Sequence, residues 1–163
     1  MTESITERDR NFVRQAARLA REAEIKGNLP VGAVIVLGDE VIAEGPNQLL
    51  VPRYDPGAHA EMVAISRVPK ELWPRAREME VFTSLEPCVM CFSTMLLHGI
   101  GRIVFGALDE RGGARFLLGN LPPYYADGKG VPLLLGPALP EECDELYRRC
   151  DELFANQPCG VKR

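Results

Sequence analysis

The sequence predicts an α/β fold in which helices cover a mixed sheet. Short apolar segments rich in β-branched residues alternate with segments of helical periodicity over the first two thirds of the chain. Strands that alternate with helices imply crossover connections and hence some parallel pairing. The chain has 163 residues, of which 46% are hydrophobic, and we expect one domain over residues 1–163 with one core.

The first third of the chain predicts a helix and a β-hairpin. From about Glu7 to Lys26, apolar residues recur every three or four positions, and Gly27 is suited to end the helix. Val31 to Leu37 is apolar throughout, which favours a strand buried on both faces. Gly38-Asp39 offers a two-residue turn, after which Glu40 to Glu44 predicts the returning strand.

The next segments are a loop, a short helix and an exposed connection. Gly45 to Gly57 is a predicted loop, and binding residues are common in loops. Residues 58–68 predict a helix with His59 and Glu61 in its first turn. On a regular helix, side chains two residues apart point to different sides. His59 and Glu61 can therefore face one target only if they lie at the start of the helix. Residues 69–79 are a predicted exposed connection.

A second strand and helix pair carries two cysteines. Met79 to Ser84 predicts a strand, and Pro87 is suited to the first position of the helix that follows. Cys88 and Cys91 are then expected on one face of the first turn, where the helix dipole favours thiolates. Arg102 to Ala107 predicts the fourth strand.

The last third is less regular. Residues 109–140 are rich in Gly and Pro, and the role of the part from 119 to 139 is not predicted. Val131 to Leu135 predicts a short edge strand, and a last helix begins at Pro140 and continues through Phe154. Residues 155–163 are an expected flexible tail.

Composition limits the class of protein. The five cysteines are an odd number, and the polar N-terminus lacks the apolar stretch of an export signal, so a disulfide framework is a poor explanation. No run of eighteen apolar residues exists, and we expect a cytoplasmic protein that is not in a membrane. The net charge of −4 argues against an extensive nucleic-acid surface.

The segments His59-Ala60-Glu61 and Pro87 to Cys91 together predict a catalytic zinc site. His59, Cys88 and Cys91 supply three of the four ligands of Zn²⁺ and leave one place for water. Glu61 offers a carboxylate that stays off the metal and moves protons. A redox Cys-x-x-Cys pair would leave His59 and Glu61 unexplained. A structural site would need a fourth ligand, for which His98 and the C-terminal cysteines have no familiar spacing.

The two segments also carry a family resemblance, because H-x-E followed by P-C-x-x-C is the signature of zinc nucleobase deaminases. From about residue 10 to 110 the chain resembles the cytidine deaminase superfamily, and most of all bacterial tRNA adenosine deaminases. The segments that carry this resemblance are PVGAVIV (30–36), Gly45-Pro46-Asn47, DPGAHAE (55–61), LEPCVMC (85–91) and GRIVFGALD (101–109).

The resemblance implies a three-layer α/β/α fold with a central mixed sheet of five strands. It further implies zinc on His59, Cys88 and Cys91, Glu61 as the proton shuttle, and a homodimer or higher homo-oligomer. It also implies that Asn47 hydrogen-bonds the base, and we favour this role over the alternative that Asn47 only shapes its loop.

Further substrate contacts are expected from the main chain at Ala60, at Leu85 or Glu86, and near Cys88. Tyr54 and Tyr124-Tyr125 are candidates for stacking on a base, and equally for burial or an oligomer contact. Cys143 and Cys150, seven apart on the last helix, are predicted packing residues, and Cys159 has no predicted role.

The substrate is predicted less firmly than the reaction, because the chain departs from the tRNA-acting enzymes after Asp109. The last helix, PEECDELYRRCDELF, has six acids against Arg148 and Arg149, and such a surface would repel RNA. We therefore expect a small nucleobase or nucleoside as substrate, with an adenosine in a tRNA anticodon loop as the alternative. A non-catalytic zinc-binding member is a remote third reading, which the intact Glu61 disfavours.

Overall fold

The computed structural model describes residues 4–127 and 130–156 and contains a five-stranded sheet of order β2-β1-β3-β4-β5. The strands are β1 (Gly32–Leu37), β2 (Glu40–Pro46), β3 (Met79–Leu85), β4 (Arg102–Ala107) and β5 (Leu133–Leu135). β1 is antiparallel to both β2 and β3, whereas β3, β4 and β5 are mutually parallel. The predicted mixed sheet, including its short edge strand, is confirmed.

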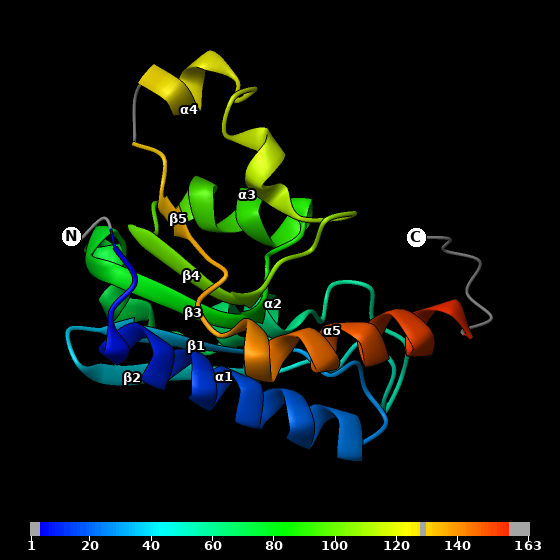
Figure 1. The fold of residues 1–163 in the computed structure, drawn as a ribbon. Helices are drawn as coiled ribbons and strands as arrows, with labels where there is room; N and C mark the ends of the chain where they lie inside the picture. The colour runs from blue at the N-terminus through cyan, green and yellow to red at the C-terminus, as the bar shows by residue number, and fades with distance from the viewer. Residues whose placement is uncertain (1–3, 128–129, 157–163) are drawn as a thin grey trace.

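Helices cover both faces of this sheet, as predicted. α1 and α5 pack on one face, and α2 and α3 lie on the other (Figure 1). The helical elements are α1 (Glu7–Ile25), α2 (Ala60–Ser66), α3 (Val89–His98), α4 (Pro123–Asp127), α5 (Pro140–Ala155) and the 3₁₀ helices η1 (Lys70–Glu78) and η2 (Ala114–Leu117). None of the helices in the described part of the chain has the length and apolar character needed to span a bilayer.

The central strands are buried on both faces because a helix lies over each face. Ala33 to Val36 of β1 are fully buried, which confirms the prediction for this strand. β2 comes unusually close to α2, since a Cβ atom on Gly45 would stand 2.0 Å from the carbonyl oxygen of Ala60. Glycine at this position therefore lets the start of α2 lie directly against the sheet.

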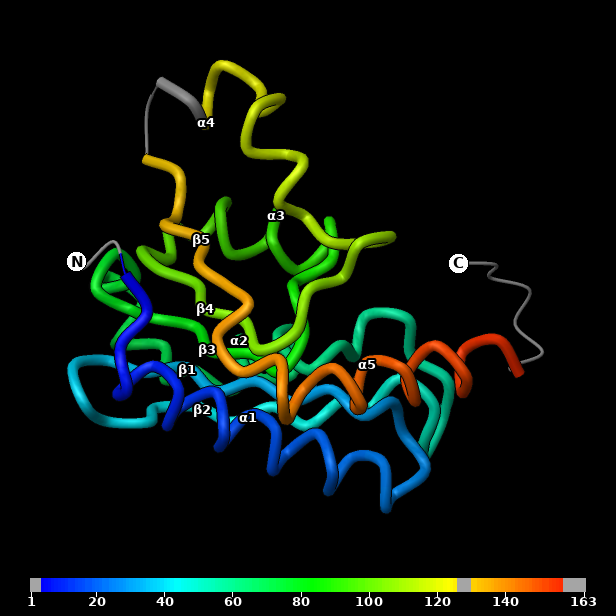
Figure 2. The backbone as a smooth tube through the Cα atoms, in the orientation of Figure 1, coloured from blue at the N-terminus to red at the C-terminus, as the bar shows by residue number. Residues whose placement is uncertain are grey.

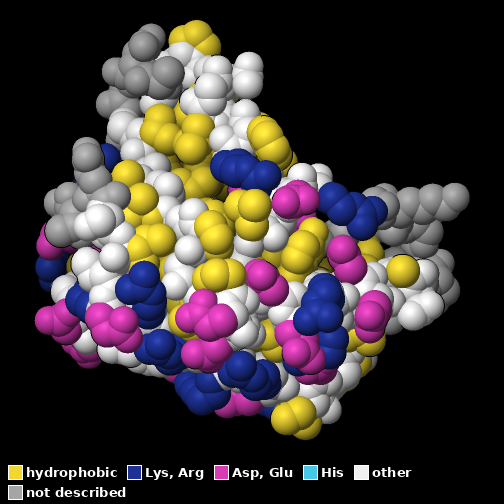
Figure 3. Space-filling view, in the orientation of Figure 1, with side chains coloured by type: hydrophobic (Ala, Val, Ile, Leu, Met, Phe, Trp, Pro, Cys, Tyr) yellow, Lys and Arg dark blue, Asp and Glu magenta, His cyan; other side chains and the backbone are white. Residues whose placement is uncertain are grey.

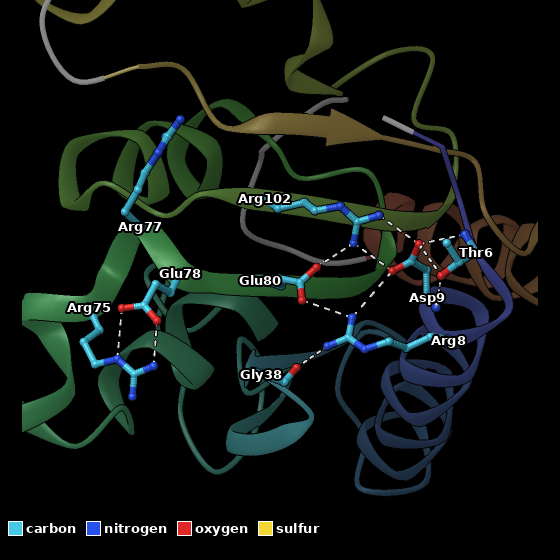
Figure 4. Close-up of a pocket in the computed structure, with 9 residues that line it drawn as sticks. All are labelled: Thr6, Arg8, Asp9, Gly38, Arg75, Arg77, Glu78, Glu80 and Arg102. Carbon is cyan, nitrogen blue, oxygen red and sulfur yellow. Dashed lines mark hydrogen bonds and ion pairs between the residues drawn. The ribbon is translucent and has the colours of Figure 1, made fainter. Parts of the chain in front are cut away.

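A buried charge cluster joins α1 to the amino ends of β3 and β4. Thr6 caps α1 in a capping box with Asp9. Arg102, fully buried at the start of β4, donates two hydrogen bonds of 2.7 and 2.8 Å to the Asp9 carboxylate and one of 2.6 Å to Glu80 of β3. Arg8 bridges to Glu80 at 3.0 Å (Figure 4). We call Arg102, Asp9, Glu80 and Arg8 the arginine cluster; it lines a groove of about 580 Å³.

Two predicted helix starts are wrong, each by two residues. α2 begins at Ala60 with His59 as its N-cap, and α3 begins at Val89 with Cys88 as its N-cap. Pro87 is therefore outside the helix. The carbonyl of Pro87 accepts a hydrogen bond of 2.9 Å from the amide of Ala114, and Cys88 pairs with Gly113 in an isolated β-bridge. These contacts keep the backbone at Cys88 extended, so the helix starts after it.

Two other predictions need correction. Residues 69–79 are mostly helical, since η1 occupies Lys70–Glu78, and Pro74 inside it lacks the amide that a regular α-helix would use. Between β4 and β5 the chain leaves the sheet and returns through η2 and α4, neither of which was predicted (Figure 2). Of the expected tail, residues 155–163, the structure describes only Ala155 and Asn156. The rest of the tail, including Cys159, lies outside the described residues. The single-domain organisation stays a prediction.

Candidate active site

Three potential metal donors converge at the carboxyl ends of the central strands. The Sγ atoms of Cys88 and Cys91 are 3.6 Å apart, and the Nδ1 atom of His59 is 3.5 Å from the first and 3.6 Å from the second. Bond lengths of about 2.3 Å to sulfur and about 2.0 Å to nitrogen would place tetrahedral donors about 3.5 to 3.8 Å apart. The triangle therefore fits zinc, and it leaves one coordination position for another ligand.

The helix starts account for this convergence. His59 and Cys88 are N-cap residues with extended backbone, so their side chains are not bound to the angular spacing of a helix. Cys91 lies in the first turn of α3. His59 and Glu61 can consequently face the same space although they are two residues apart. The sequence required α2 to start at His59 if His59 and Glu61 were to share a target, and the structure places the start of α2 there.

The two thiols differ in acidity because the contact between them shifts their pKa values in opposite directions. The sulfur of Cys91 and the imidazole of His59 stabilise the thiolate of Cys88 and lower the pKa of Cys88 to about 4. Cys91 is fully buried, and its contact with Cys88 together with burial raises its pKa well above the usual range. A thiolate is the form of cysteine that binds metal, so Cys88 is already prepared as a ligand.

Glu61 lies in the first turn of α2, beside the three donors, and is only 3% exposed. Burial raises the pKa of its carboxyl, and the nearby sulfur of Cys88 raises it further. The hydroxyl of Thr83 on β3 lies 3.4 Å from Oε1 of Glu61 and 3.3 Å from the carbonyl oxygen of Gly32. A buried carboxyl with a raised pKa is suited to exchanging protons near neutral pH.

A narrow cavity opens onto these groups. Its volume of about 20 Å³ is enough for about one water molecule. Apolar and polar side chains from both halves of the chain line it: Leu29, Val31, Asn47, His59, Glu61, Leu85, Glu86, Cys88, Asp109 and Cys150. Asn47 is 3% exposed, and its Oδ1 atom accepts a hydrogen bond of 3.0 Å from the amide of Leu49. Its amide nitrogen retains donor capacity for a ligand.

Other predicted contacts are placed unevenly. Leu85 and Glu86 line the cavity, whereas Ala60 is buried beside β2 and is not among the lining residues described. Tyr54 and Tyr124 are exposed, and Tyr124 packs edge-on against Tyr125 with ring centroids 5.1 Å apart. The main-chain contacts expected at Ala60, Leu85 and Glu86 stay predictions.

The structure adds residues that we did not predict at this site. Cys150 of α5 is buried, as expected of a packing residue, but it also lines the cavity, whereas Cys143 packs against Gly106. Asp109 lines the cavity too, and its Oδ1 atom accepts a hydrogen bond of 2.8 Å from the hydroxyl of Tyr147 on α5. Tyr147 and Cys150 are one helical turn apart, which is the signal in the sequence that could have placed them on one face.

Comparison with known proteins gives consistent results. The sequence model described as "Cytidine and deoxycytidylate deaminase zinc-binding region" matches residues 6–107. A tRNA-specific adenosine deaminase of Bacillus subtilis is 38% identical over 115 residues, covering 69% of this chain and 70% of the relative. The tRNA-specific adenosine deaminase of Haemophilus influenzae is 37% identical over 144 residues, covering 86% and 81%.

Solved structures agree with this similarity. One from work on A-to-I editing by tRNA:A34 deaminases superposes with a TM-score of 0.71 at 29% identity and covers 84% of this chain and 99% of its own. A guanine deaminase from Nitrosomonas europaea superposes with a TM-score of 0.69 at 22% identity, covering 90% of this chain and 86% of its own. At that identity the second likeness concerns the fold alone.

Proposed function

Because the chain belongs to the cytidine and deoxycytidylate deaminase family, whose shared region binds zinc, we propose that it hydrolytically deaminates adenosine to inosine in a tRNA anticodon loop. The observation that carries the reaction is the convergence of His59, Cys88 and Cys91 beside the buried carboxyl of Glu61. The substrate proposal is supported by the relatives from B. subtilis and H. influenzae, which are tRNA-specific adenosine deaminases.

The proposed chemistry divides between the metal and the chain. His59, Cys88 and Cys91 would hold zinc, which would act as a Lewis acid and lower the pKa of water so that hydroxide is available near neutral pH. Glu61 accepts the proton of the attacking water and delivers protons to the ring nitrogen and then to the departing amine, which leaves as ammonia. Asn47 orients the base by donating a hydrogen bond to one of its acceptors. The narrow cavity limits competing water around the reacting carbon.

The acidity of α5 weighs less against RNA than its composition suggests. Glu142 pairs with Arg14 of α1 at 3.1 Å, Glu145 pairs with Arg149 at 2.9 Å, and Asp151 pairs with Arg111 at 3.5 Å. Charges of both signs are interspersed over the face that carries α1 and α5 (Figure 3). These pairs weaken the negative field that led us to expect a small substrate.

A free nucleobase or nucleoside is the second candidate, favoured by one observation. Cys150 and the Tyr147–Asp109 contact place α5 on the wall of the cavity, whose volume of about 20 Å³ offers little room. A small molecule would need less rearrangement of this wall than an anticodon loop. The guanine deaminase from N. europaea shows that the same fold can take a free base.

A substrate panel tests the proposal. Zinc-loaded protein is given an anticodon stem-loop with adenosine at the wobble position, the same stem-loop with guanosine there, and free adenine, adenosine, guanine, cytosine and cytidine. We expect ammonia and inosine from the adenosine stem-loop alone, with turnover that falls steeply as salt rises. Turnover of a free base or nucleoside with no product from the stem-loop would support the second candidate and overturn the first.

A further inference from the structure

Glu86 is a fully buried carboxylate that is neither a proposed zinc ligand nor the proposed proton shuttle. It follows β3 directly, stands two residues before Cys88, and has a side chain that is 0% exposed. Its amide continues the sheet by donating a 2.8 Å hydrogen bond to the carbonyl of Ala107. An ionised carboxylate at such a position is very costly unless charged or hydrogen-bonding partners compensate for the lost water.

Among the described residues, the hydrogen-bond and ion-pair partners of the Glu86 carboxylate belong to the segment 109–115. Oε2 accepts a hydrogen bond of 3.2 Å from the amide of Asp109, and Oε1 accepts one of 3.0 Å from the amide of Arg115. The guanidinium of Arg115 forms an ion pair with Oε2 and also donates a hydrogen bond of 3.2 Å to the carbonyl of Asp109. Both carboxylate oxygens are therefore engaged by one segment, which they hold in a closed loop.

The same segment touches the zinc-binding segment directly. Gly113 pairs with Cys88 in a β-bridge, and Ala114 donates to the carbonyl of Pro87 at 2.9 Å. A Cβ atom on Gly113 would stand 2.2 Å from the carboxyl carbon of Glu86, so the backbone runs immediately over the carboxylate. At the other end of the segment, Asp109 lines the cavity. One buried carboxylate thus lies beneath both a metal ligand and a cavity wall.

We propose that Glu86 is a positioning residue for the reaction. Its carboxylate, paired with Arg115, holds the segment 109–115 against Pro87 and Cys88, which fixes the direction of the Cys88 sulfur and the place of Asp109 on the cavity wall. The effect on turnover rests on the proposed function, whereas the effect on the metal ligand does not.

The test compares two identical substitutions near the two ends of one strand. Glu86→Gln keeps the shape of the side chain but removes its charge. Glu80→Gln is the matched control, since Glu80 of β3 also pairs with arginines but belongs to the arginine cluster. Both full-length variants are loaded with Co²⁺ in place of zinc, and the thiolate-to-cobalt absorption is recorded together with metal affinity, melting temperature and kcat.

We expect Glu86→Gln to shift the thiolate-to-cobalt band and to weaken metal affinity or kcat by about 10- to 100-fold, the usual effect of losing an outer-shell partner. Glu80→Gln should lower the melting temperature without moving the band or kcat. An unchanged band and kcat in Glu86→Gln, or equal changes in both variants, would overturn the proposal.

Arg115→Gln supplies a second route if Glu86→Gln does not fold, because the Arg115 side chain is 30% exposed and less embedded. It should shift the band in the same direction. The double variant should change no more than the larger single variant, since the two side chains act as one unit; additive changes would contradict this. If the wild-type protein turns over no member of the substrate panel, the proposed function fails, while the cobalt spectra still decide the role of Glu86.

Discussion

Two groups of buried charge lie at opposite ends of β3 and β4 and behave in opposite ways. At the amino ends, Asp9 is 1% exposed and receives two hydrogen bonds from Arg102. Burial alone would raise the pKa of Asp9, but the hydrogen bonds from Arg102 and Thr6 outweigh it, and the pKa is lowered. At the carboxyl ends, Glu61 is 3% exposed, and its pKa is raised. Equal burial therefore leads to opposite acidities.

The low exposure that the two carboxyls share does not decide what each can do; their partners and the protein that surrounds them do. Asp9 is held as an anion by a guanidinium that it meets with both oxygens, so it contributes to stability and has no proton to exchange. Burial and the nearby sulfur of Cys88 favour the neutral form of Glu61, so a proton is within reach. We therefore assign a structural role to the arginine cluster, whereas the groups proposed for the reaction lie at the carboxyl ends of the strands.

The sharpest test of this contrast is Glu61→Gln, which keeps the size of the side chain and removes the exchangeable proton. We expect kcat to fall by about 10²- to 10⁴-fold, as for loss of a general acid and base. Zinc content, measured by atomic emission, should stay near that of the wild type, because Glu61 is not a proposed ligand. Loss of zinc from this variant would show that a ligand has been misassigned.

The matching change at the other end is Arg102→Met, which leaves the Asp9 carboxylate buried without its guanidinium. We expect the free energy of unfolding in urea to fall by about 3 to 5 kcal/mol, as when one partner of a buried pair is removed. The kcat of the folded fraction, measured well below the melting temperature, should not change. A large fall in kcat at full folding would mean that the two ends are coupled and would break the comparison.

Acid should separate the two ends as well. Because the folded-state pKa of Asp9 is depressed, its contribution to stability is fully present above its unfolded pKa of about 3.9 and is lost as pH falls through the lower folded value. Urea unfolding of the wild type should therefore lose more stability between pH 5 and pH 3 than that of Asp9→Asn. Parallel curves for the two proteins would contradict the assigned lowering of the pKa.

The smallest effect is expected from Arg75→Gln on the rim of the same groove. Arg75 and Glu78 pair at 2.6 Å, but their side chains are 53% and 57% exposed. Water and salt screen such a pair, so thermal unfolding should show no shift beyond experimental error. A clear loss of stability would mean that the rim belongs to the arginine cluster and not to solvent.

The chemical end was easier to predict from sequence than its support. His59, Glu61, Cys88 and Cys91 stand in two short segments whose residue types admit few chemistries. Glu86 was predicted only as a main-chain contact, because its partner Arg115 lies 29 residues further along in a segment without periodicity. A pair of that kind depends on how the chain returns to the sheet, which no local pattern records.

The helices and strands, too, were predicted well only where a local sequence pattern determines them. β1 and α1 were predicted closely because burial imposes a period on their residues. The starts of α2 and α3 were displaced, since tertiary hydrogen bonds to Pro87 and the bridge at Cys88 set the start of α3. η2 and α4 were missed because Gly and Pro dominate their surroundings and propensity gives no signal there.

α5 has a consequence for how this chain can diverge from its relatives. One side of the helix brings Cys150 to the cavity and Tyr147 to Asp109 on the cavity wall, and the other carries Glu142, which pairs with arginines of α1. Mutations on that outer face change the ion pairs that hold α5 in place, and α5 also forms part of the cavity wall. Selection for a new substrate can therefore act on surface charges far from any atom that reacts, and paralogues should differ first along this helix.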